Sequence, residues 1–124
     1  MSRTMHRWVL AALAGTTLAA VCYAADKPKY TIKEVMKELH KGDNAPCKKV
    51  AKGEGTKEDL AKFVEYYTAM AQQDPPKGDA KEWHAKATKL LNATKALQAG
   101  KPGALDSFKE AINCKSCHSA HKPD

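Results

Sequence analysis

The sequence is poor in aromatic residues and contains no segment with the pattern of a β-strand. Phe, Trp and Tyr together make up 6% of its 124 residues. No segment shows the strict alternation of apolar and polar residues that is typical of a half-buried strand, so we expect an all-α protein. A chain of this length forms one small domain. A core with so few aromatic side chains often depends on a disulfide, a metal or a cofactor for its stability.

Arginine is also scarce, and both arginines lie close to the N-terminus. Arg3 and Arg7 precede an apolar run at 8–21 that is followed by small residues, which is the pattern of a secretory signal peptide. Residues 1–24 are therefore predicted to be a cleaved leader that directs the protein to the periplasm, and residues 25–124 to be the mature domain. The apolar run is short for a membrane-spanning helix, so we expect no stable membrane anchor after cleavage.

The predicted mature domain contains an odd number of cysteines: Cys47, Cys114 and Cys117. An odd number argues against a framework made only of disulfides. Cys47 is the isolated one, and an isolated thiol in an exported protein is buried, oxidisable or bridged to another chain. The proline before Cys47 and the two lysines after it favour partial exposure and a lowered pKa, so a disulfide-linked homodimer is one interpretation.

Apolar residues spaced three and four positions apart predict four helical segments. Glycine and proline clusters separate them, and a threonine or aspartate suited to capping precedes each of the first three. The predicted segments are 31–41, with a short continuation at 46–51; 56–73; 79–99; and a fourth that carries Leu105 and Ile112 and continues into the C-terminal cysteines. Four helices joined by short loops indicate an antiparallel four-helix bundle.

The C-x-x-C-H sequence at 114–118 is the attachment signature of c-type haem. Two thiols three residues apart on a helix reach the two vinyl groups of one porphyrin, and the adjacent imidazole of His118 is then held against the iron. A thioredoxin-like dithiol belongs near a βαβ pattern, which is missing here. A zinc site needs four well-placed ligands, and only Cys47 or a remote histidine would complete one. The motif therefore predicts one covalent haem c.

A four-helix chain with this motif near its C-terminus resembles the class II c-type cytochromes, the cytochrome c′ family. The resemblance covers residues 30–121. It depends on the terminal motif, on the opening helix from Thr31 to His40, and on the Pro/Gly-rich break before the third helix. It implies that the haem lies inside the bundle near the C-terminal helix, with His118 as the proximal iron ligand and a residue of the first helix on the distal side.

The resemblance aligns the distal position with Met36. It implies the low-spin, six-coordinate, electron-transfer type, in which a methionine is the second axial ligand; such ligation raises the reduction potential. Met36 lies in the apolar stripe of the first helix, a position that equally suits core packing. His40, one helical turn later, is the alternative sixth ligand, whereas Met70 is expected to be a core residue.

Two further histidines are expected outside the iron site. His84 is predicted to be a surface or edge residue, and His121 to lie in a fraying C-terminal tail. Either side chain could donate a hydrogen bond to a haem propionate, but nothing in the sequence requires it.

Together these features predict a periplasmic electron carrier rather than an enzyme. One alternative is a five-coordinate cytochrome c′ that binds nitric oxide or carbon monoxide; another is a peroxidase-like enzyme, for which no distal acid–base groups are apparent. The formal charge of +7 falls to +5 without the leader, and the remaining lysines are spread along every helix. They suit a solvated surface and the attraction of acidic redox partners. The lack of arginine after the leader argues against nucleic-acid binding, and pairing through helices would give a homodimer.

Overall fold

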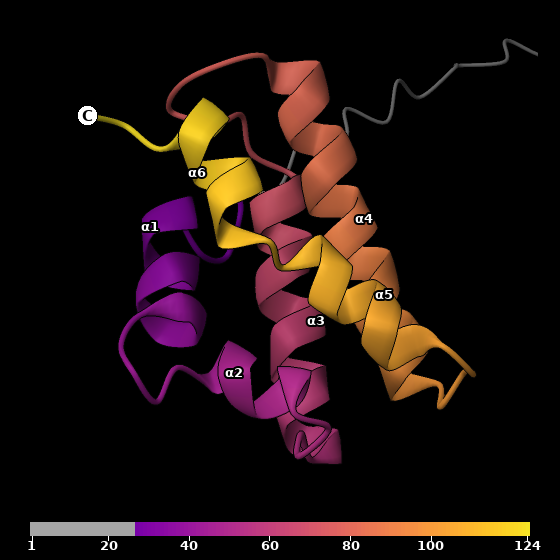
Figure 1. Ribbon diagram of the computed structural model, residues 1–124. Helices are drawn as coiled ribbons and strands as arrows, with labels where there is room; N and C mark the ends of the chain where they lie inside the picture. Colours follow the sequence, from indigo (N-terminus) through magenta and orange to yellow (C-terminus); the bar gives the residue numbers. More distant parts are fainter. Residues whose placement is uncertain (1–26) are drawn as a thin grey trace, which may run out of the picture.

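The computed structural model describes residues 27–124, and all regular structure in this part of the chain is helical (Figure 1). The predicted leader at 1–24 lies outside the described residues. The elements are α1 (Ile32–Val35), the π-helical segment η1 (Met36–His40), α2 (Pro46–Ala51), α3 (Lys57–Ala71), α4 (Ala80–Gln98), α5 (Ala104–Ala111) and α6 (Cys114–His121). The prediction of an all-α protein is confirmed for these residues. None of their helices combines the length and apolar character needed to cross a membrane.

Three helix starts follow the capping pattern predicted from the sequence. The Thr31 hydroxyl accepts a hydrogen bond from the backbone N–H of Glu34 at 3.2 Å, and the Glu34 carboxylate accepts one from the N–H of Thr31 at 2.7 Å. Thr56 and Asp59 form the same reciprocal pair before α3. The Asp79 carboxylate caps α4. These contacts satisfy backbone donors that a helix start leaves without partners.

The first helical segment departs from the predicted regular α-helix. Only α1 is α-helical, and the chain then changes to π-helical hydrogen bonding in η1. In a π-helix each backbone N–H donates to the carbonyl five residues earlier, rather than four residues earlier as in an α-helix. Short π segments occur frequently at functional sites. The segment begins at Met36 and ends at His40, the two candidate distal residues.

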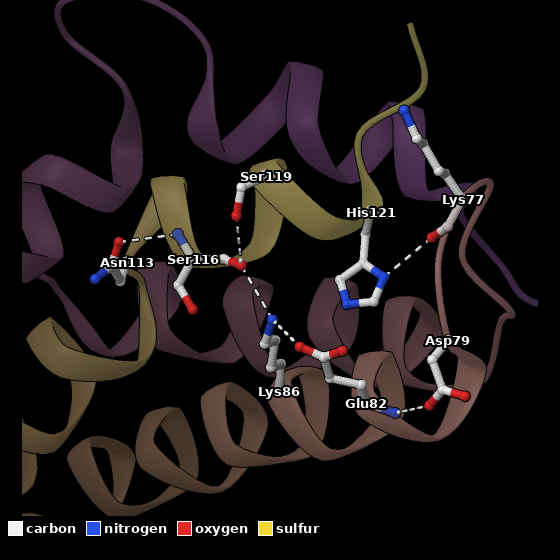
Figure 2. A network of polar contacts seen from close by, with 8 residues as sticks. All are labelled: Lys77, Asp79, Glu82, Lys86, Asn113, Ser116, Ser119 and His121. Atoms are coloured by element: carbon white, nitrogen blue, oxygen red, sulfur yellow. Dashed lines mark hydrogen bonds and ion pairs between the residues drawn. The ribbon is translucent and has the colours of Figure 1, made fainter.

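The predicted continuous fourth helix is wrong, because the structure divides it into α5 and α6. The helix α5 ends after Ala111, and Asn113 adopts an extended conformation with φ −61° and ψ 96°. The Asn113 side chain accepts a hydrogen bond from the N–H of Ser116 at 3.1 Å and so caps α6 (Figure 2). Asparagine competes for backbone hydrogen bonds in this way and favours helix starts over helix interiors. The break allows α6 to turn away from the line of α5 toward α1 (Figure 1).

The core lies between α3, α4 and α5, and buried residues of the first helical segment and of α2 complete it. The helices α3 and α4 pack side by side in opposite directions, and α5 packs on α4 (Figure 1). Phe63 and Tyr67 of α3 are almost completely buried and meet edge to face, with ring centroids 5.4 Å apart. Phe108 of α5 lies 6.3 Å from Phe63. These three aromatic residues lie where the helices meet, an arrangement compatible with the predicted helical bundle.

Candidate functional site

A cavity of about 620 Å³ lies among α1, η1, α4 and α6. Its volume falls in the range of about 300–1,000 Å³ that is usual for small-molecule sites. The lining is mainly apolar and includes Ile32, Met70, Trp83, Ala87, Leu90 and Ile112. The structure brings together on this cavity residues from both ends of the described chain: Met36 and His40 of η1, and Cys114, Cys117 and His118 of α6.

The two thiols of the C-x-x-C-H motif lie on the first turn of α6. Cys114 is exposed and Cys117 is half-buried, and both are free thiols. Burial raises the pKa of the Cys117 thiol, although the nearby Lys86 ammonium acts in the opposite direction. Residues three apart on a helix are neighbours on one face. Both sulfurs therefore lie at the same cavity wall, where a single planar group can reach them.

Met36 is the first residue of η1 and is only partly exposed. It lines the cavity. Met70, expected to be a core residue, is 3% exposed and belongs to the main apolar cluster, but it also lines the cavity. The site therefore contains two thioethers, of which only Met36 belongs to the first helical segment.

His40 has a hydrogen-bond partner that the sequence did not indicate. Its Nε2 atom lies 2.9 Å from the Tyr67 hydroxyl. Burial lowers the pKa of His40 to about 4, with the charge of His118 as a smaller cause. Burial also raises the pKa of Tyr67, which keeps the phenol protonated. Burial thus favours a neutral His40 ring beside a protonated phenol, and the tautomer of the ring decides which of the two groups donates.

Under the haem hypothesis, this hydrogen bond would favour Met36 over His40 as the distal ligand. Ligation through Nε2 would break the contact and leave the buried Tyr67 hydroxyl without its partner. An unsatisfied buried hydroxyl costs about 1–3 kcal/mol. The Met36 thioether has no comparable bond to lose.

His121 is anchored and does not lie in a fraying tail. It is 3% exposed, its Nδ1–H donates to the Lys77 carbonyl at 3.0 Å, and its ring meets Trp83 edge to face at 5.4 Å (Figure 2). Its Nε2 atom is buried without a hydrogen-bond partner among the described residues. The prediction was wrong because the residues that hold His121 lie about forty positions earlier in the chain, on α4 and the loop before it.

Gly78 makes this anchor sterically feasible. It has φ +84°, and a Cβ atom at this position would lie 2.4 Å from the Ala120 carbonyl oxygen and 2.9 Å from His121 Nδ1. Only glycine allows the loop to approach the end of α6 so closely. The Pro-Pro-Lys-Gly sequence indicated a break between helices, but not this contact.

Lys86 provides a second connection between α4 and α6. Its ammonium group donates to the Ser116 carbonyl at 3.0 Å and pairs with Glu82 at 2.7 Å (Figure 2). The four-residue spacing of Glu82 and Lys86 predicts a surface ion pair, but nothing local indicates the bond to Ser116. Together with His121, Lys86 fixes α6 at two points and so orients Cys117 and His118 at the cavity.

The structure corrects the expectation for Cys47 and agrees with that for His84. Cys47 is 5% exposed, and burial raises the pKa of its thiol, so the predicted exposure and lowered pKa are wrong. The local sequence suggested exposure, but α2 turns Cys47 into the core. A disulfide to another chain would require α2 to open.

His84 lies at an edge, where its ring bonds the Ala71 carbonyl at 2.9 Å and the Asp74 carboxylate at 3.0 Å.

The potential metal ligands at the cavity suit a metal whose other ligands come from a cofactor rather than from the protein. Within residues 27–124, no three or more His, Cys, Asp or Glu side chains converge into a metal-binding group. A haem iron takes its equatorial ligands from the porphyrin and needs only one or two from the protein. Two free thiols, an adjacent imidazole and an apolar cavity meet that need. No family model, curated protein or solved structure matches this chain.

Proposed function

We propose that this protein is a periplasmic c-type cytochrome that carries single electrons through one covalent haem c. In this proposal the helices form an antiparallel four-helix bundle of the class II type, with the haem near α6. The observation that carries it is the meeting of the C-x-x-C-H residues and Met36 on one apolar cavity. Bound haem would supply the one-electron chemistry of its iron.

The residues of the chain have separate tasks in binding. Cys114 and Cys117 would each add S–H across a vinyl group, so that sulfur bonds one carbon and the hydrogen goes to the other. The imidazole of His118 would bind the iron on the proximal side and the thioether of Met36 on the distal side. The anchored α6 holds Cys117 and His118 in place before attachment.

The remaining cavity residues would control the environment of the iron. Apolar side chains such as Trp83 and Leu90 exclude water and favour the less charged, reduced site. Retention of both His118 and Met36 in the two oxidation states would keep the change of geometry small. A small change of geometry is what rapid electron transfer requires, and it distinguishes a carrier from a gas-binding protein.

The absorption spectrum of the ferric protein tests the proposal. We expect low-spin bands together with the weak charge-transfer band of a thioether–iron bond. Met36→Ala should abolish that band and allow carbon monoxide to bind after reduction. Met70→Ala is the matched control, because Met70 also lines the cavity, and this variant should retain the band. A high-spin spectrum in the unmodified protein would instead indicate a five-coordinate, gas-binding site.

A further inference from the structure

A second hollow, of about 490 Å³, adjoins the cavity and shares several of its lining residues. It is lined by Met36, His40 and His118 and by four lysines, which we call the lysine collar: Lys33, Lys37, Lys41 and Lys122. All four lysines are exposed. They come from the first helical segment, from the residue that follows η1, and from the tail after α6, so only the folded chain assembles them.

The positive charge of the lysine collar is only partly balanced: hydrogen bonds from Thr31 and, to a smaller extent, the charge of Lys37 lower the pKa of Glu34. None of its four lysines forms an ion pair within 4.0 Å with a carboxylate of residues 27–124. Three of the acidic residues nearest in sequence have other partners, and a fourth, Asp43, is exposed and forms no ion pair with the collar. Glu34 caps α1 through Thr31, and Glu38 lies 4.0 Å from Lys62. Asp124 pairs with Lys77 at 2.7 Å.

The lysine collar also lies beside the proposed electron path. Both proposed axial ligands, Met36 and His118, line the hollow, whereas neither Cys114 nor Cys117 does. Even if both carboxylates of a bound haem emerged here, the four ammonium groups would outnumber them.

We propose that the lysine collar is the docking surface for an electron-transfer partner with an acidic surface. The inference rests on the proposed function. Clustered like charge beside a hollow raises the rate of encounter with a molecule of opposite charge, and salt weakens the effect. Exposed lysines with flexible side chains suit a short-lived complex, because little surface is buried in such an interface and the partner can dissociate quickly.

Small redox reagents of opposite charge test the location of this surface. We compare Lys37→Glu/Lys41→Glu with a control, Lys95→Glu/Lys101→Glu, which makes the same change of net charge at exposed positions that line neither hollow. At low ionic strength the collar variant should react roughly 10-fold more slowly with hexacyanoferrate(III). It should react faster with hexaammineruthenium(II). The control should stay within about twofold of the unmodified protein in both reactions.

A second variant and a binding measurement guard against a folding artefact. Lys122→Glu lies outside every helix and should shift both rates in the same directions as the collar variant. Hexacyanochromate(III), a redox-inactive paramagnetic trianion, should broaden the NMR signals of the lysine collar before those of other lysines. Equal rates for the collar and control variants, or broadening centred elsewhere, would overturn the proposal. Collar-dependent binding to anionic phospholipid vesicles without a rate difference would also overturn it, by assigning the surface to a membrane.

The two proposals fail in different ways. If the protein carries no redox-active haem, the unmodified protein will show no haem spectrum and no change of haem absorbance with either reagent. If only the docking proposal is wrong, the spectrum and both reactions will be present, but the position of the substituted lysines will not matter.

Discussion

At the scale of single residues, the contact between His40 and Tyr67 sets the environment of His40 at the cavity, and in the proposed function it would favour Met36 as the distal ligand. The bond occupies Nε2 of His40, and burial keeps the ring neutral. With Nε2 engaged by the Tyr67 hydroxyl, the His40 side chain supports the wall of the cavity. Met36, at the other end of the same short π segment, has a thioether without such a bond.

The pKa of His40 gives stability a pH dependence of definite sign. The folded pKa, about 4, lies below the ordinary value of 6.5. Between these values the unfolded chain binds a proton that the folded chain does not, so the stability present above pH 6.5 is lost as pH falls toward 4. We expect a loss on the order of 1–3 kcal/mol over this range. Urea unfolding at pH 7 and pH 4.5 measures it, and His40→Gln should reduce the difference; an unchanged difference would exclude His40 as its source.

The thiols provide a second test at this scale. Replacement of both Cys114 and Cys117 by serine should abolish haem that remains bound after denaturation, as detected by haem staining of a denaturing gel. Cys47→Ala is the control and should retain covalent haem, because the buried Cys47 thiol does not line the cavity. Loss of covalent haem in the control alone would contradict the assignment of the attachment residues.

At the scale of elements, α6 is the critical piece, since it carries the entire C-x-x-C-H motif within eight residues. So short a helix has little stability of its own. Its position depends on the Asn113 cap, on the bond from Lys86 to Ser116, and on the anchoring of His121 (Figure 2). Loosening these contacts should therefore affect the site before it affects the rest of the fold.

Alanine substitutions at two glycines distinguish the stability cost of a steric clash from the cost of backbone strain. Gly78 and Gly100 both have positive φ, at +84° and +68°. A Cβ atom at Gly78 would collide with the end of α6, whereas one at Gly100 would meet nothing within 4 Å. Gly100→Ala should cost about 1 kcal/mol from backbone strain alone. Gly78→Ala should cost about 1–3 kcal/mol more. Urea unfolding compares the two variants, and equal losses would show that the loop yields at no cost.

At the scale of the whole molecule, two features are assembled from distant parts of the chain. The cavity joins the first helical segment to α6 across α4, and the lysine collar joins η1 to the C-terminal tail. In the proposed function these features are complementary, since one holds the redox group and the other receives its partner.

The sequence by itself determined those features that depend on neighbouring residues. The helix starts at Thr31, Thr56 and Asp79 were predictable because a cap bonds a backbone group three residues away. The all-α class followed from periodicity, and the haem hypothesis followed from a five-residue motif. Such signals lie within a few neighbouring residues and do not depend on how the rest of the chain packs.

Only the tertiary structure decided features whose causes lie far away in the sequence. His121 looked like part of a frayed tail until Trp83 and the Lys77 carbonyl came into contact with it. Cys47 looked exposed beside its lysines until α2 turned it into the core. Burial and hydrogen bonding between distant segments set these environments, and both arise only when the helices pack. The sequence therefore determined which groups this protein carries, and packing decided which of them face the cavity.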